Sequence, residues 1–384
     1  MIYYRIIIIA GWMLFSCCDY QTNTESEKFE YNVNIEISDE SLILSNYFSE
    51  IDAVFLESND EAMIGNVDKI IYKNHRLYLL DRSNSKAIFV FTEDGKYLTK
   101  ISAHGKGPGE FETPHDFIIH TDKEKMFILE PNLQKIIEYD LNGIFIKETK
   151  INFNAFFFEC INDNLFCFST GNIGTRNIKK TKMFYADSSF NVIEGFIPLG
   201  AYENLSIFPY TVFTKNMDDV YYTPILENKV YKILPSGPNP YLKINFGSKA
   251  LDLELLNKSQ SPMSKMNLIG EGDYAYNISN FIDTGGRFYF HYSYNRMNYL
   301  TIYVKKTGLC KTSSRLSNDI NHIPFGPPLW SAGNKIISVV EPFAIKEYIK
   351  FLSANNLPNP MPKTFENLGE FSNPILLLAK EKEN

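Results

Sequence analysis

Short apolar runs recur along the chain from about residue 64 onward, separated by turn residues and repeating with a period near 48 residues. The run Leu77–Asp81 returns 49 residues later as Met126–Glu130, and Phe91–Gly95 returns 48 residues later as Tyr139–Gly143. Asp-Gly and Asn-Gly close the second pair of runs, and both dipeptides favour tight hairpins because they tolerate positive φ. Each repeat therefore predicts four short antiparallel strands.

Weaker copies of the same unit follow to the end of the chain. They comprise 165–168 with 183–187, 220–222 with 230–233, 287–290 with 300–304, and 335–340 with 375–378. Six units of about 48 residues need roughly 290 residues, which fits a region over 50–384. Repeated four-stranded sheets of this length are typical of propeller blades around a central channel. The predicted fold is all-β, a six-bladed β-propeller of four-stranded antiparallel blades with short helical insertions.

A closed ring needs its ends joined, because an open ring leaves edge strands unpaired. The run 51–56 precedes the first repeat and has no partner within it, so we expect it to complete the blade that contains the strand 375–378. This closure predicts a strong dependence on the last ten residues. Two stretches depart from the β pattern and predict helices, 249–256 and 343–355.

The N-terminal residues have the pattern of an export signal. The only charge among residues 1–16 is Arg5, and an apolar run from Ile6 to Phe15 follows it, too short for the ~20 residues that a bilayer span requires. Leu14-Phe15-Ser16-Cys17 resembles a bacterial lipobox, which implies lipidation at Cys17; an ordinary secretory signal or an uncleaved anchor are the alternatives. Residues 17–49 are interpreted as an N-terminal spacer and lead-in. The expected location is the bacterial cell envelope, tethered to a membrane by lipid, with the outer membrane favoured and its face left open.

Composition and charge limit the classes of partner that the protein can bind. The 384 residues carry 38 Lys+Arg and 45 Asp+Glu, a net charge of −7, and loss of Arg5 with the signal changes this to −8. An acidic chain offers no basic field for nucleic acid, so no nucleic-acid partner is expected. The 30 Phe and 24 Tyr against 2 Trp favour a β-rich core. In a propeller these rings are expected to fill the wedges between neighbouring blades.

Four cysteines remain if Cys17 carries lipid. Cys160 and Cys167 flank a predicted turn at Asp163-Asn164, and a two-residue hairpin would place them directly opposite each other. A cross-strand disulfide is one interpretation. We favour the other, two buried free thiols, because four thiols do not form the framework of a disulfide-rich protein.

The segment Gly105–Phe111 (GKGPGEF), followed by Pro114 and an apolar run, resembles the start of an NHL-type propeller repeat. The whole chain is similar to the six-bladed β-propeller lipoproteins abundant in Bacteroidetes, through this segment together with Leu56-Glu57, Ile64-Gly65 and Asn373–Leu376. The resemblance implies a fold and an envelope location but no established activity. A phosphate cradle at Gly105–Gly109 is disfavoured, since the Lys-Ser/Thr ending and a following helix are both missing from the pattern. The segment is interpreted as a tight crossing between blades.

Candidate binding residues are those at the starts of the predicted inner strands, where propeller channels open. They are Asp68, Lys69, His115, Asp116 and Asn280. His115 beside Asp116 suggests an acid/base pair or a cation site, as in NHL-like lyases and lactonases; the simpler interpretation is hydrogen bonding between blades. The six His show no metal-ligand spacing, so no metal ligand is assigned.

These features favour a non-enzymatic binding or scaffold module for a glycan, a peptide or an envelope protein, without a cofactor. The alternative is a lyase, lactonase or hydrolase that uses a divalent cation at the channel mouth. The two differ in whether carboxylates and a histidine converge there.

Overall fold

The computed structural model describes residues 27–120, 123–174, 178, 180–200, 205, 211–216, 218–259, 261–369 and 372–383. The predicted signal peptide (1–16), the lipidation site Cys17 and the first part of the spacer lie outside these residues.

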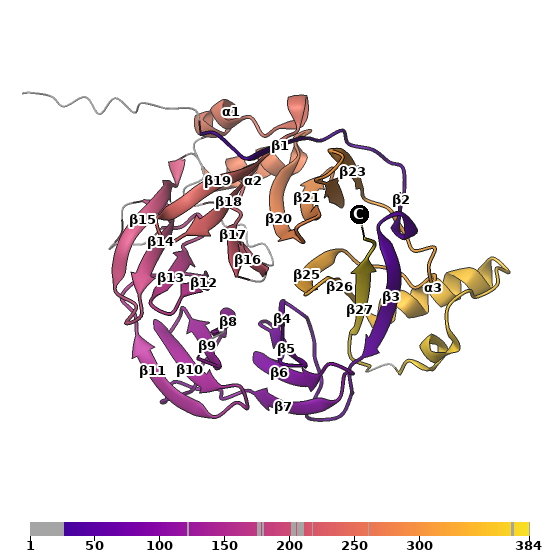
Figure 1. Cartoon of the computed structure of the whole chain (residues 1–384), viewed down its shortest axis with the longest axis horizontal. Coiled ribbons are helices and arrows are strands. Elements are labelled where there is room, and N and C mark those ends of the chain that lie inside the picture. The colour runs from indigo at the N-terminus through magenta and orange to yellow at the C-terminus, as the bar shows by residue number, and fades with distance from the viewer. Residues whose placement is uncertain are drawn as a thin grey trace, which may run out of the picture.

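Six sheets of antiparallel strands surround a central axis, which confirms the predicted six-bladed β-propeller (Figure 1). Blade 1 is β4 (Lys69–Lys73), β5 (Arg76–Asp81), β6 (Ala87–Thr92) and β7 (Tyr97–Ile101), and blade 2 is β8 (Asp116–His120), β9 (Lys125–Glu130), β10 (Lys135–Asp140) and β11 (Phe145–Lys150). Blade 3 is β12 (Phe157–Asn162), β13 (Leu165–Ser169), β14 (Thr181–Asp187) and β15 (Val192–Pro198), and blade 4 is β16 (Phe213–Asn216), β17 (Asp219–Tyr222), β18 (Lys229–Leu234) and β19 (Gly237–Asn245). Blade 5 is β20 (Tyr276–Asp283), β21 (Arg287–Tyr294), β22 (Met297–Val304) and β23 (Leu309–Ser313).

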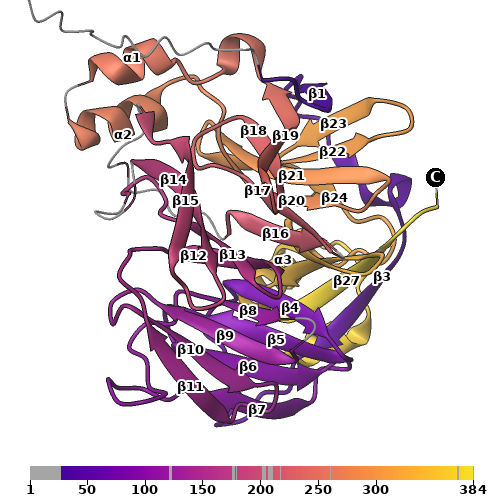
Figure 2. The same ribbon diagram turned by 60° about the vertical axis from the view of Figure 1, so that its left-hand side comes forward.

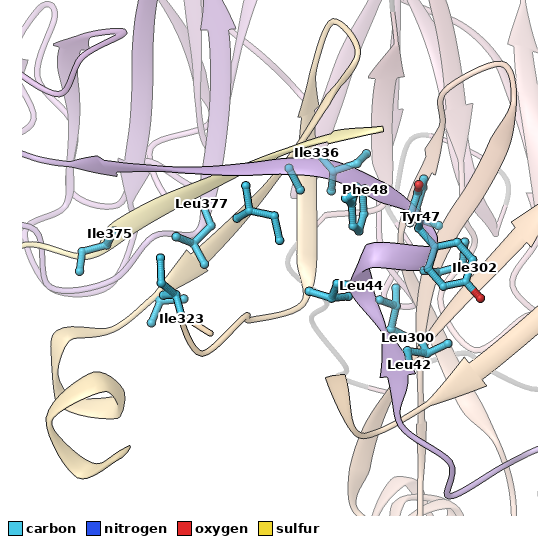
Figure 3. Packing of buried hydrophobic residues seen from close by; sticks show 14 of the residues in the cluster. Leu42, Leu44, Tyr47, Phe48, Leu300, Ile302, Ile323, Ile336, Ile375 and Leu377 are labelled. Atoms are coloured by element: carbon cyan, nitrogen blue, oxygen red, sulfur yellow. The ribbon is translucent and has the colours of Figure 1, made fainter. Parts of the chain in front are cut away.

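Blade 6 joins the two ends of the described chain. Its strands are β25 (Pro328–Ala332), β26 (Lys335–Val340), β27 (Ile375–Glu381) and β3 (Phe48–Phe55), in that order. The C-terminal β27 therefore lies between β26 and the N-terminal β3, with Leu377 opposite Ala53. Figure 3 shows Phe48, Ile375 and Leu377 packed in one cluster with Leu300 and Ile302 of blade 5.

The lead-in contains strands that the hydrophobic pattern did not indicate. β1 (Tyr31–Asn34) adds a fifth, parallel strand to the outer edge of blade 4, and β2 (Leu42–Ile43) pairs with β24 (Leu316–Ser317) beside blade 5. The indigo segment in Figure 1 runs along the rim from β1 to β2 and on to β3. Most of this region is thus a strap across two blades, whereas the sequence predicted only a spacer and lead-in.

The hydrophobic core is divided among the junctions between blades. The described residues form six buried clusters, and each draws its side chains from two neighbouring blades. Alternate residues of one strand serve opposite clusters: Leu77 and Leu79 face blade 6, whereas Tyr78 and Leu80 face blade 2. The wedges are rich in Phe and Tyr, as the composition predicted.

The acidic residue that ends the second strand in blades 1 and 2 has a structural role. Asp81 and Glu130 are both fully buried. One oxygen of Asp81 accepts the backbone N–H of Gly65 (2.8 Å), and Glu130 accepts that of Glu112 (2.9 Å). Each carboxylate thereby anchors the chain that enters its own blade, and a buried backbone N–H must find such a partner. The need to satisfy these backbone N–H groups explains why an acidic residue recurs at this place in the two repeats.

The glycine-rich segment Gly105–Phe111 is the crossing from blade 1 to blade 2. The Gly109 N–H donates to Glu148 (3.0 Å), and Lys135 donates to the Gly107 carbonyl (3.0 Å). Gly109 has a φ of +76°, and a Cβ there would lie 2.8 Å from the ring of Phe145. Only glycine fits this conformation and this contact. The backbone of the crossing is therefore held by blade 2 itself, in keeping with the structural interpretation.

Cys160 and Cys167 are buried free thiols, so the alternative of a cross-strand disulfide was wrong. A bulge after Cys160 shifts the register of the hairpin, and Cys160 lies opposite Phe166 while Cys167 lies opposite Glu159. A shift of one residue reverses the face of a strand. Cys160 consequently packs between blades 2 and 3, and Cys167 packs between blades 3 and 4.

The part of the chain that the structure describes contains three α-helices between the blade strands, and Figure 2 shows where they lie. α1 (Leu253–Lys258) begins after Asp252, whose side chain caps it by accepting two backbone N–H groups, so the helix predicted over 249–256 starts later than expected. α2 (Pro262–Glu271) follows it without a sequence prediction, and α3 (Pro342–Ala354) confirms the predicted 343–355. Short 3₁₀ turns occupy Leu44–Asn46, Gly247–Lys249 and Lys363–Asn367. None of the helices in the described ranges is both long and apolar enough to cross a membrane.

Candidate functional site

The six inner strands β4, β8, β12, β16, β20 and β25 surround the central channel (Figure 1). A cavity of about 370 Å³ lies along them and is lined by residues from every blade. Its charged lining comprises Lys69, Lys73, Glu159, Lys215, Asp218 and Asp283. The propeller thus gathers charges that are far apart in the sequence.

Two of the predicted site residues, Lys69 and Asp116, form an ion pair across the junction of blades 1 and 2. The Lys69 Nζ lies 2.8 Å from Asp116 Oδ1, and both side chains are buried. Asp116 also accepts the backbone N–H of Phe117 (2.9 Å) and that of Phe158 in blade 3 (3.0 Å). One carboxylate therefore ties three blades together. Both of its carboxylate oxygens already accept bonds from the protein. This arrangement matches the simpler interpretation of Asp116, hydrogen bonding between blades.

His115 lies beside this pair but is bonded elsewhere. Its Nδ1 is 2.6 Å from the Phe156 carbonyl oxygen, so this nitrogen carries the proton and donates it. Burial, with a contribution from the nearby Arg82, lowers the pKa of His115 to about 4. The ring is accordingly neutral at physiological pH. Ligand binding by His115, Asp116 and Lys69 stays a prediction.

Asp68 and Asn280, the other predicted residues, meet at the mouth where the inner strands begin. A cavity of about 220 Å³ there lies between blades 1, 5 and 6. It is lined by Asp68, Arg82, Asn277, Ser279, Asn280, His291, Tyr292, Ser293, Asn298, Pro327 and Leu329, and we call it the mouth pocket. Asp68 Oδ2 accepts the backbone N–H of Arg82 at 2.7 Å, which fixes the loop that carries the arginine.

Irregular backbone places the two asparagines of the mouth pocket. Asn277 and Asn280 have φ of +59° and +50°, and the pairing of β20 with β21 shifts register twice in the same stretch. Asparagine tolerates the left-handed region better than most residues do. Such bulges redirect side chains relative to a regular strand. The sequence prediction placed Asn280 here; it missed Asn277, because the bulges leave no clear signal in the hydrophobic pattern.

Sequence reasoning also missed Arg82, Glu159 and Lys215. Arg82 directly follows the repeated acid Asp81, a position that could have been examined as the start of a loop at the channel mouth. Glu159 is 5% exposed in the channel wall, and burial raises the pKa of its carboxyl. Lys215 reaches the Cys160 carbonyl oxygen at 3.4 Å. Both lie in inner strands whose turn signals are weaker than those of the first two blades.

Histidine 291 supplies a pH-dependent contribution to stability. Its Nε2 donates to the Pro328 carbonyl oxygen (2.7 Å), and complete burial lowers its pKa to about 4. In the unfolded chain the imidazole of His291 takes up a proton near pH 6.5, whereas in the folded chain it stays neutral down to about pH 4. The free energy of unfolding therefore falls as the pH drops from 6.5 towards 4. We expect His291 to account for roughly 2–3 kcal/mol of the loss between pH 7 and pH 4.5. Urea unfolding at the two pH values measures it.

The matched variants isolate this histidine. His291→Gln should reduce the loss of unfolding free energy between pH 7 and pH 4.5 by roughly 2–3 kcal/mol. Gln at the exposed His104 should leave that loss unchanged. Equal slopes for wild type and His291→Gln would show that the ring is protonated in the folded protein.

The described ranges offer few side chains that could coordinate a metal ion together. They contain no cluster of three or more His, Cys, Asp or Glu side chains that could hold a metal ion. The convergent carboxylates and histidine on which the cation-dependent alternative depends are not seen there.

Comparison with known families identifies the chain. The model of a domain of unknown function, DUF4934, matches residues 29–380. The chain belongs to the DUF4934 family. The match extends over all six blades and includes the strap formed by β1 and β2, so the strap is part of the DUF4934 unit. No curated protein matches the chain.

The chain is also similar to solved structures of other proteins. A candidate exported protein of Bacteroides fragilis superposes with a TM-score of 0.77 at 16% identity, over 92% of this chain and 100% of that chain. A DUF4221 member from Bacteroides vulgatus has a TM-score of 0.49 at 12% identity, covering 87% and 97%. A virginiamycin B lyase from Staphylococcus aureus has a TM-score of 0.41 at 14% identity, covering 76% and 86%. At 16% identity, the Bacteroides fragilis structure supports the fold of this DUF4934 protein and nothing beyond it.

Proposed function

We propose that this protein is a lipid-anchored, non-enzymatic binding module of the bacterial cell envelope, and that its ligand enters the mouth pocket. The observation that carries the proposal is the contrast between the polar groups that the protein already satisfies and those that it leaves without partners. Lys69 and Asp116 pair with each other, and Asp116 and His115 are also bonded to backbone. At the mouth, polar atoms of Arg82, Asn277 and Asn280 are buried without a hydrogen-bond partner in the described structure.

Buried polar atoms without partners are costly, at about 1–3 kcal/mol each, and a ligand that satisfies them gains that energy back. A rigid rim built from several blades holds such atoms in place, so little order has to be created on binding. A glycan fragment or a peptide end has the hydrogen-bonding groups that this pocket requires. These features support binding rather than turnover, because the acid/base pair His115 and Asp116 is already committed.

A ligand screen on the detergent-solubilised full chain tests the proposal. Neutral and acidic saccharides, short peptides and envelope extracts are scanned by thermal shift, with Ser293→Phe as a variant that blocks the rim of the mouth pocket. Phe at the exposed Ser353 of α3 is the matched control. We expect a ligand that raises the melting temperature of wild type and the control but not of Ser293→Phe. Conversion of that ligand to products, or binding that ignores the block, would contradict a binding role at the mouth.

The location rests on the lipobox-like segment, and the exported-protein description of the Bacteroides fragilis neighbour is in keeping with it. Lipid on Cys17 should hold the chain in the membrane fraction, since the following residues are polar. We expect Cys17→Ala to move the protein from the membrane fraction to the soluble periplasmic or secreted fraction. Fractionation with immunoblotting measures this, and Cys18→Ala is the neighbouring control. Membrane retention of Cys17→Ala would refute the anchor.

A further inference from the structure

The Arg82 guanidinium is the strongest unsatisfied group of the mouth pocket. Its Nε and Nη2 are buried and have no hydrogen-bond partner in the described structure. The neighbouring carboxylate, Asp68, accepts the backbone N–H of Arg82 but no hydrogen bond from these two nitrogens. The residue as a whole is partly exposed, but buried N–H donors without acceptors are costly, and a carboxylate is the natural partner of a guanidinium because it can accept two parallel N–H bonds.

Aromatic packing orients this guanidinium. Its central carbon lies 5.7 Å from the ring centroid of Phe157, which begins blade 3. Arg82 belongs to blade 1, so its side chain reaches across the opening rather than along its own blade. A planar cation held over an aromatic face keeps its N–H fork in a defined direction. The donors are therefore presented in a fixed orientation to whatever occupies the mouth pocket.

Acceptors line the remainder of the mouth pocket. The Oδ1 atoms of Asn277 and Asn280 are buried without partners in the described structure, and Asn280 is 3% exposed. His291 is neutral and donates through Nε2, so its Nδ1 is an acceptor. Asp68 adds a carboxylate. A ligand must accordingly bring an anionic group to Arg82 and several hydrogen-bond donors to these oxygens.

From these contacts we propose that the mouth pocket binds a sugar acid, a single ring whose carboxylate pairs with Arg82 and whose hydroxyls donate to Asp68, Asn277 and Asn280. This inference rests on the proposed binding function and names its ligand class. A cavity of about 220 Å³ is smaller than the ~300–1,000 Å³ of most ligand pockets, which favours one ring over a folded peptide. A free amino acid shares the carboxylate, but its three N–H donors all lie on one ammonium nitrogen. The hydroxyls of a sugar ring are spread over several carbons and therefore reach more of the separated acceptors.

The experiment compares probes that differ only in the carboxylate. Sodium D-galacturonate and D-galactose are titrated into the solubilised full chain by saturation-transfer NMR and calorimetry, with alanine and alaninamide as the amino-acid arm. We expect saturable binding of galacturonate and at least 10-fold weaker binding of galactose. Arg82→Gln should weaken galacturonate roughly 10- to 100-fold, because a charged hydrogen-bond pair is lost. The affinity of Arg82→Lys for galacturonate should lie between those of wild type and Arg82→Gln. Arg315→Gln, an exposed control, should bind galacturonate as tightly as wild type.

Each other outcome has a defined meaning. Equal binding of galactose and galacturonate, or full binding by a folded Arg82→Gln, overturns the sugar-acid assignment. Arg82-dependent binding of alanine but not of galacturonate overturns it in favour of an amino-acid ligand. A neutral ligand that Ser293→Phe blocks and Arg82→Gln does not would overturn this inference and leave the proposed function standing. Failure of every probe and every screened compound to bind overturns both.

Discussion

Truncation of the chain after Pro374 is expected to abolish folding. It removes β27, the strand between β26 and β3, and so breaks blade 6 in two. Ile375, Leu376 and Leu377 are at most 1% exposed, and their burial alone contributes about 5–9 kcal/mol. That loss is comparable with the ~5–15 kcal/mol that stabilises a whole domain, and it also leaves two strand edges unpaired. We expect insoluble protein, or a soluble chain without a cooperative urea transition.

A shorter truncation provides the control. Ending the chain at Lys382 keeps β27, and it keeps the bonds from Lys382 to the Tyr47 carbonyl and from Arg287 to the Lys382 carbonyl. This variant should unfold at the urea concentration of wild type. A chain cut after Pro374 that retained a native near-UV circular dichroism spectrum would show that blade 6 does not need its third strand. Figure 3 makes clear why we expect otherwise, since Leu377 lies within the cluster that joins blades 5 and 6.

Substitution of Asp283 by alanine is expected to cost about 3–5 kcal/mol of unfolding free energy. This buried carboxylate accepts bonds from Tyr221 (3.0 Å), Tyr241 (2.6 Å) and Lys305 (2.7 Å) at the junction of blades 4 and 5. Burial and the charge of Asp283 together raise the pKa of both tyrosines, so they remain donors. Alanine removes the acceptor that these three donors share. The Lys305 cation, whose Nζ lies 4.5 Å from the ring centroid of Phe288, then keeps the Tyr241 hydroxyl (3.2 Å) as an acceptor but has lost its carboxylate.

Two further variants separate charge from packing. Lys305→Met in the Asp283→Ala background should recover part of the loss, because the uncompensated cation is then gone. Alanine at Asp52, whose ion pair with Lys335 is only partly buried, should cost at most about 1 kcal/mol. Urea denaturation of the four proteins gives the comparison. Equal losses for Asp283→Ala and Asp52→Ala would mean that the blade 4 and 5 junction tolerates an unpaired lysine.

The sequence alone predicted the fold because its signals are local. Apolar runs recur at a fixed period along the chain, and in blades 1 and 2 they are accompanied by an Asp-Gly or Asn-Gly turn and by the acids Asp81 and Glu130. Closure of the ring could be anticipated for the same reason, since the run 51–56 had no partner within its own repeat. The apolar runs predicted for blades 3 to 6 also fall within strands of those blades, although their turn signals are weaker. The pattern gave no sign of the strap strands β1 and β2.

The candidate site could be predicted only in part. Knowing where inner strands begin was enough to select Lys69, Asp116 and Asn280, but it did not reveal that Lys69 pairs with Asp116 or that Arg82 reaches across the mouth. The Cys160 and Cys167 pair shows the same limit at short range, because one bulge moved them to opposite faces of blade 3.

Periodicity and turn chemistry are properties of neighbouring residues, so the sequence by itself determined the blades and their number. The partners of the charged residues were decided by the ring, which brings residues of different blades to one axis. Asp116 meets Lys69 across 47 positions and Phe158 across 42, one blade in each direction. Contacts of that kind depend on the relative placement of whole sheets, which no local pattern encodes, and the unpartnered Arg82 and Asn280 emerge only once that placement is known.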